Sequence, residues 1–100
     1  MSVVKDVFRQ DRRLVILRLL GEDRAGSLNE RVVQKALAAY GHNLNDAELR
    51  GELQFLQNEL AIDIEQIADG ALWVAHLARR GELHLTRQDV IAGVARPSRR

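Results

Sequence analysis

The side chains best suited to hold a metal ion or to move protons are three histidines, His42, His76 and His84. Their spacing does not match that of zinc ligands, and the chain has no cysteine that would complete a zinc site. The serines lie at the ends of the chain or at an expected helix cap, not in the turn that activates a nucleophile (Ser2, Ser27 and Ser98). We therefore expect a protein that is not an enzyme and that binds neither metal nor cofactor.

A different chemistry, the reading of DNA bases, is indicated by the stretch NDAELRGELQFLQNEL from Asn45 to Leu60. A helical rotation of about 100° per residue places four leucines on one face, which we assign to the core (Leu49, Leu53, Leu56 and Leu60). The outward face and its flank carry side chains that suit hydrogen bonds to base edges. The DNA-reading candidates are Arg50, Gln54, Gln57 and Asn58.

The charge around this helix works against DNA binding. Asp46 to Leu77 holds seven acids and only Arg50 as a base, a net charge of −6, whereas the rest of the chain holds fourteen bases and seven acids, a net charge of +7. Glu48 and Glu52 stack on one flank of the helix, where they would repel phosphates. Affinity for DNA would have to come from the basic ends, and the phosphate-anchoring candidates are Arg12, Arg13, Arg79 and Arg80.

The same acids favour a second reading, in which the partner is a basic protein. Phe55 lies among glutamates on the helix, and Leu72 and Val74 are expected on the exposed side of a hairpin. An apolar patch with a charged rim is typical of a protein interface. The acidic helix and the acidic hairpin would then dock a basic partner.

The segment from Val3 to Leu20 is expected to be helical, because apolar residues recur at helical spacing and neither Gly nor Pro interrupts them. Beside its core stripe, a second apolar stripe is placed to contact another subunit, which predicts a homodimer. The alternative is two helices that meet near Asp11 and fold onto one core. Together with Phe55, the second stripe supplies the protein-interface candidates Val4, Phe8, Val15, Leu19 and Phe55.

The next helices are marked by caps. Ser27 with Glu30 has the form of a capping box that starts the second helix, and Gly41 is placed to end it. Asn45 with Glu48 has the same form at the start of the third helix.

After Leu60 the apolar period changes to two, and Asp69-Gly70 supplies the turn of a hairpin that pairs Ile67 with Leu72 and Ile62 with Leu77. This register also places Asp63 opposite His76 on the exposed side. A short helix is expected from Arg79 to Gln88, after a turn near Gly81. The last residues, 93–100, read as a flexible basic tail, which leaves residues 1–92 as one domain.

The whole chain has 100 residues, of which 46% are hydrophobic, enough for one compact domain. The absence of cysteine excludes disulfides and thiol chemistry. The first ten residues are charged and lack the apolar core of a signal peptide, and no apolar run is long enough to span a bilayer. We therefore expect a cytoplasmic protein that does not enter the membrane.

Five stretches carry a resemblance to a known family: DRRLVILRLL (Asp11 to Leu20), LNERVVQKALAAYGH (Leu28 to His42), the leucine pattern of the third helix, DGALWVAHLARRG and GVARP. In these the chain resembles small winged-helix proteins encoded by Mu-like transposable phages and prophages. The resemblance implies a mainly α fold with a small β-hairpin, a winged helix-turn-helix of three helices, a two-stranded wing and a short C-terminal helix.

The expected function follows from this resemblance and from the third helix. We expect a phage-type protein that binds double-stranded DNA, in transcriptional regulation or genome handling. The alternative is an adapter or a phage assembly subunit that docks a basic partner. Both functions act by binding and not by catalysis.

Overall fold

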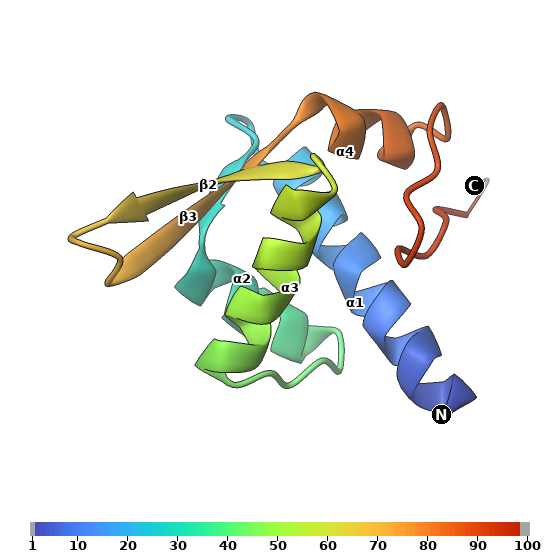
Figure 1. Cartoon of the computed structure of the whole chain (residues 1–100), viewed down its shortest axis with the longest axis horizontal. Helices are drawn as coiled ribbons and strands as arrows, with labels where there is room; N and C mark the ends of the chain where they lie inside the picture. The colour runs from blue at the N-terminus through green and yellow to red at the C-terminus, as the bar shows by residue number, and fades with distance from the viewer. Residues whose placement is uncertain (1, 99–100) are drawn as a thin grey trace.

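The computed structural model of the chain describes residues 2 to 98. Within this range the chain forms four helices and one antiparallel sheet of three strands. In chain order these are α1 (Val3–Glu22), β1 (Ser27–Asn29), α2 (Glu30–Ala39), α3 (Asp46–Asn58), β2 (Ile62–Ile67), β3 (Leu72–Leu77) and α4 (Arg79–Leu85). The sheet, with strand order β1-β3-β2, lies across one end of α1, α2 and α3 (Figure 1). The expectation of a mainly helical fold with a small hairpin is confirmed in this form.

The first helix is continuous, so the alternative of two helices meeting near Asp11 is wrong. Its buried residues all lie in its second half, between Leu14 and Leu20. There it packs against the other helices around the core (Val33, Leu37, Leu49, Leu53, Leu56, Ile62 and Ala75). Its first turns extend beyond the rest of the domain (Figure 1).

The start of α3 is as predicted: Asn45 accepts a hydrogen bond from the Glu48 backbone, and the Glu48 side chain accepts one from the Asn45 backbone. The predicted start of α2 is wrong. Asn29 caps this helix, and Ser27 lies instead in β1, a strand that the sequence did not indicate. The Glu30 side chain is thereby free for other partners.

The predicted hairpin register is confirmed from the Ile62–Leu77 pair to the Ile67–Leu72 pair. Asp69 and Gly70 both have positive φ, and the Ala71 amide donates to the Ala68 carbonyl across the turn. This is the left-handed conformation that an Asp-Gly turn adopts at low cost. The third strand, β1, pairs with the other edge of β3.

Three expectations for the part of the chain after α3 are corrected. Leu60 does not join the core, because it follows α3 in a left-handed turn and leaves its side chain exposed. Gly81 lies inside α4, buried against the Ala61 carbonyl, and α4 ends at Leu85. The segment from Gly93 onward was expected to be a flexible tail, yet Val94 and Pro97 are buried. Arg99 and Arg100, the end of that predicted tail, lie outside the described residues.

Candidate binding surfaces

Arg50, the first DNA-reading candidate, is bound to other groups of the domain. Its Nε and Nη2 atoms donate to the two carboxylate oxygens of Glu30, each at 2.7 Å. Nη2 also donates to the carbonyls of Gly70 and Ala71 in the hairpin turn. The guanidinium lies over the Trp73 ring, 4.5 Å from its centre. Arg50 therefore ties α3 to α2 and to the hairpin.

The charges of this pair stabilise each other. The Arg50 guanidinium holds the pKa of the Glu30 carboxyl below its ordinary value, although burial acts in the opposite direction. The Trp73 amide, which donates to Glu30 at 2.7 Å, lowers this pKa further. Glu30 in turn raises the pKa of Arg50. The charge of Arg50 is thus already balanced by a carboxylate within the domain.

The other three reading candidates differ in whether their side chains are already bound to another element of the domain. Gln54 and Asn58 are exposed one turn apart on α3, and the Gln54 amide donates to the Asn58 side chain at 3.0 Å. Gln57 is occupied, because its Oε1 accepts the backbone N–H of Ile64 in β2 at 2.8 Å. The structure thus leaves a short neutral strip on α3.

Two of the four phosphate-anchoring candidates pair with a buried acid. Glu52 is only 4% exposed and accepts hydrogen bonds from the Nε atoms of both Arg12 and Arg13. Arg13 also donates to the Gly93 carbonyl at 3.0 Å and lies 3.6 Å over the Phe55 ring centre. Phe55 is therefore half-buried under a guanidinium and does not form an open interface patch. Glu52, expected to repel phosphates, is neutralised by its partners.

The other two anchoring candidates lie at the start of α4. Arg80 donates to Asp89 at 3.1 Å and to the carbonyl of Glu59 at 2.9 Å. The pKa of Asp89 is lowered first by the Val90 amide and then by Arg80. Arg79 is exposed, with Glu82 at 3.8 Å. Of the four, only Arg79 stays available to an external phosphate.

The acidic residues of α3 and the hairpin point in different directions. Asp46 and Glu48 are exposed at the start of α3. Asp63 and Glu65 alternate with core residues of β2, so they lie on the outer face of the hairpin, away from the helices. Asp69 is exposed at the turn. The predicted docking surface therefore divides into the α3 end and the hairpin.

Ser27, His76 and Glu65 form a hydrogen-bonded chain across the three strands that the sequence did not predict. Ser27 Oγ lies 2.6 Å from His76 Nδ1, and His76 Nε2 lies 2.9 Å from Glu65 Oε1. Asp63, the expected neighbour of His76, pairs with it only through the backbone. None of the three residues lines a described pocket, so this geometry offers a reacting group no enclosed site. Their separation of up to 49 positions gave no local signal.

The remaining histidines have structural partners. His84 is buried, with Nε2 against the Ala95 carbonyl and Nδ1 accepting the Ile91 amide. His42 is buried and lies 2.8 Å from an Asp11 oxygen. No cluster of three metal-ligating side chains occurs among residues 2 to 98.

The predicted subunit stripe on α1 is divided in two. Val15 is buried in the domain's own core and Leu19 packs against that core, so neither is free to meet another subunit. Val4 and Phe8, in the first turns, are 63% and 55% exposed. Only the N-terminal part of the stripe is a candidate interface.

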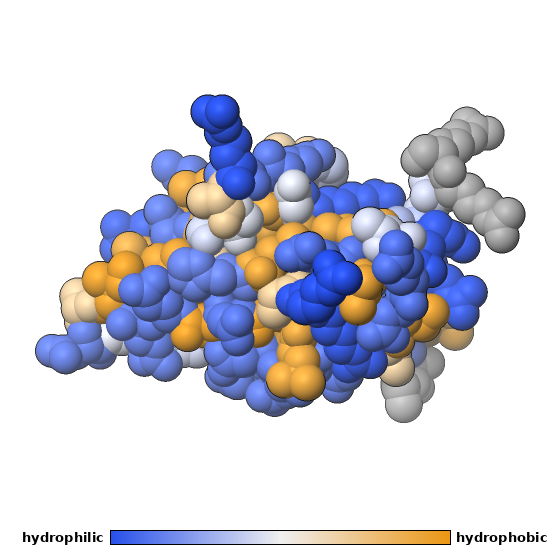
Figure 2. Space-filling view, turned by 90° about the horizontal axis from the view of Figure 1, so that it is seen from above, coloured by the Kyte–Doolittle hydropathy of each residue, from blue (hydrophilic) through white to orange (hydrophobic). Residues whose placement is uncertain are grey.

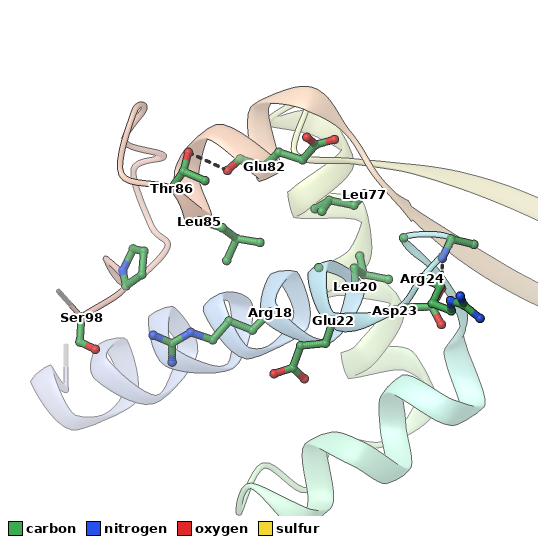
Figure 3. A pocket seen from close by; sticks show the side chains of 14 residues that line it. Arg18, Leu20, Glu22, Asp23, Arg24, Leu77, Glu82, Leu85, Thr86 and Ser98 are labelled. Carbon is green, nitrogen blue, oxygen red and sulfur yellow. Dashed lines mark hydrogen bonds between the residues drawn. The ribbon is translucent and has the colours of Figure 1, made fainter. Parts of the chain in front are cut away.

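An open hollow of about 700 Å³ lies between the end of α1, the turn that follows it, and α4. Leu20, Leu77 and Leu85 converge on it, and Arg18 extends along it toward Ser98 (Figure 3). Acids and bases both stand around it (Arg18, Glu22, Asp23, Arg24 and Glu82). The hollow therefore favours neither charge of ligand.

Among the described residues, no helix has the length and apolar character needed to cross a membrane. No protein-family model and no solved structure matches the chain. A protein of Haemophilus influenzae strain Rd is 36% identical over 77 residues, which are 76% of this chain and 72% of that protein. The uncharacterized protein gp26 of Escherichia phage Mu is 35% identical over 95 residues, which are 95% of this chain and 96% of gp26. The likeness to Mu-like phage proteins is thus confirmed over nearly the whole length, and the chain belongs to the family of phage Mu gp26.

Proposed function

We propose that the domain is a winged helix that acts by binding, and that the outer face of its hairpin docks a basic segment of a partner protein. The element order α1, β1, α2, α3, β2, β3, with β1 paired to β3, supports a winged helix-turn-helix in which the hairpin is the wing. Membership in a phage family is compatible with a partner encoded by the phage or by its host.

The observation that carries the proposal is the composition of the hairpin's outer face. On β2 this face presents Asp63, Glu65 and Ile67, and all three are exposed. On β3 it presents Leu72 and Val74, which are partly exposed. Hydrophobic areas lie among hydrophilic ones at the hairpin end of the molecule (Figure 2). Apolar contact together with two carboxylates fits a segment that carries both apolar and Lys or Arg side chains.

Electrostatics favour a protein over DNA at this end of the domain. Every charged side chain that is exposed between Asn45 and Leu77 is an acid (Asp46, Glu48, Asp63, Glu65 and Asp69). Arg50, the one Lys or Arg in this stretch, is bound to Glu30. A phosphate backbone would therefore meet repulsion and no free cation here.

Duplex DNA is the second candidate partner. It is favoured by the winged-helix element order and by the neutral strip of Gln54 and Asn58, whose amides suit base edges. On this reading, substitution of both residues by alanine removes sequence preference. The exposed bases of α2, Arg31 and Lys35, would then contribute phosphate contacts.

Binding titrations monitored by fluorescence anisotropy distinguish the two candidate partners, a basic protein segment and duplex DNA. The purified protein is titrated against a labelled Lys/Arg-rich peptide with interspersed leucines, and against labelled duplexes of phage and scrambled sequence, at low and physiological salt. The test variant combines Asp63→Asn, Glu65→Gln and Asp69→Asn; asparagine tolerates the left-handed turn at position 69. The control is Glu22→Gln, an exposed acid at the end of α1, outside the hairpin.

We expect the peptide to bind the wild type and the control equally, and to bind the hairpin variant at least about tenfold more weakly, as the loss of charge pairs at an interface predicts. Unchanged peptide affinity in a folded hairpin variant would contradict docking on this face. Preference for one phage duplex at physiological salt, lost on Gln54→Ala with Asn58→Ala, would establish the DNA reading instead.

A further inference from the structure

The first two turns of α1 carry an apolar patch that no other part of the described chain, residues 2 to 98, covers. We call Val3, Val4, Val7 and Phe8 the arm patch; their exposed fractions are 76%, 63%, 60% and 55%. The first buried residue of the helix is Leu14. The first turns of α1 lie at the opposite end of the molecule from the hairpin (Figure 1).

The arm end of α1 is the part of the helix most prone to fraying. A helix in a protein draws most of its stability from packing of an apolar face, and the packed residues of α1 begin only at Leu14. Valine at three of the four patch positions lowers helix propensity further, because its branched side chain loses rotamers against the preceding turn. Ser2 caps the end and Phe8 touches His42 edge-on, with ring centres 6.0 Å apart. These contacts leave the valines exposed to solvent, so a cover over the patch would stabilise the helix.

The charges beside the arm patch indicate what covers it. Lys5 and Arg9 are bases, and Asp6 and Asp11 are acids. Arg12 and Arg13 are paired with Glu52, so the surround is neutral and carries both signs. A strongly basic or acidic partner would find as many repulsive as attractive groups here. A second copy of the chain brings an equal set of both signs, so each base has an acid within the dimer.

We propose that the arm patch is the contact of a homodimer, in which the first turns of two α1 helices pack against each other around a two-fold axis. Two-fold pairs in which both subunits use the same patch are the commonest soluble assemblies. Helices on anionic membranes, the other common use of an exposed apolar stripe, carry a mainly basic polar face, which α1 lacks here. The dimer would leave both hairpins free.

The size of the patch sets the expected strength. A stable interface of standard size buries about 800 Å² on each partner. Four side chains on two helical turns, with Tyr40 exposed beside the loop that holds His42, supply less than this. We therefore expect a dimer with a dissociation constant on the order of micromolar.

The test is sedimentation velocity of the full chain from about 1 to about 100 µM, a range that brackets a micromolar dissociation constant. The arm variant is Val4→Glu with Val7→Glu. The matched control is Val32→Glu with Val90→Glu, two valines that are 45% and 50% exposed on other parts of the surface. We expect the wild type and the control to change from monomer to dimer with a shared dissociation constant, and the arm variant to raise that constant about 100-fold or more.

Far-ultraviolet circular dichroism of the same samples gives a second readout. Helix content of the wild type should fall on dilution as the first turns of α1 lose their cover, whereas the arm variant should show the lower value at all concentrations. A folded wild type that stays monomeric throughout would overturn the proposal. So would an arm variant that dimerises like the wild type, or a monomer that binds lipid vesicles through the same valines.

Discussion

The Glu30–Arg50 pair predicts a measurable loss of stability in Glu30→Gln. The carboxylate accepts two hydrogen bonds from Arg50 and one from the Trp73 amide. Glutamine has only one side-chain oxygen that can accept hydrogen bonds. Its NH₂ group takes the place of the second carboxylate oxygen, and there it would face donors from which it cannot accept. At least one charge-assisted hydrogen bond is lost, which costs about 1.5–3 kcal/mol.

This loss is measurable in a domain of this size. For 60–100 residues, 1 kcal/mol corresponds to about 4–8 °C in Tm, so Glu30→Gln should lower Tm by roughly 6–24 °C. The assay is urea unfolding at pH 7, with thermal unfolding in parallel. The control is Glu48→Gln, because glutamine can also close a capping box; its free energy of unfolding should change by less than about 0.5 kcal/mol.

The pH dependence adds a second check with a definite sign. The pKa of Glu30 is lowered in the folded state, so its contribution is complete above the ordinary carboxyl pKa and is lost as pH falls through the folded value. The gap in stability between wild type and Glu30→Gln should therefore narrow in acid. A gap below about 1 kcal/mol at neutral pH, or one that stays constant into acid, would refute the assigned role of the pair.

Two further predictions concern charge burial and glycine. Glu52→Gln removes the buried carboxylate that Arg12 and Arg13 share, and should lower the free energy of unfolding in urea by about 3 kcal/mol; a change near zero would mean that the arginines find other partners. Gly51→Ala and Gly81→Ala should have opposite signs. A Cβ at position 51 meets nothing within 4 Å, so alanine should stabilise α3 by about 0.5–1 kcal/mol. A Cβ at position 81 would lie 2.3 Å from the Ala61 carbonyl oxygen, so alanine should destabilise by about 2 kcal/mol or more, and equal effects of the two in thermal unfolding would contradict this packing.

The elements that were predicted correctly have local causes. The hairpin register follows from alternating apolar residues and from the turn preference of Asp69-Gly70. The start of α3 follows from Asn45 and Glu48, which satisfy each other's backbone within one turn. Neither depends on a distant part of the chain, so both could be read from the sequence.

The incorrect predictions concern side chains whose partners lie far away in sequence. Arg12 and Arg13 are about forty positions from Glu52, and no local pattern shows that these charges meet. Ser27 and Glu30 have the spacing of a capping box, but the side chains of both bind residues of β3 instead. Ser27 contacts His76, and Glu30 accepts a hydrogen bond from the Trp73 amide. The site candidates were therefore chosen by residue type, and tertiary pairing decides which of them stay free.

The hydrogen bond from the Ile64 amide to Gln57 has a consequence for how chains can associate. β2 is an edge strand, and the free amides of an edge strand can template pairing with a strand of another chain. The amide of Ile64, at the middle of this edge, already donates its hydrogen bond to the Gln57 side chain of the same molecule. A strand of another molecule would have to displace this side chain before it could pair with β2. The hydrogen bond therefore disfavours the first step of sheet formation between molecules.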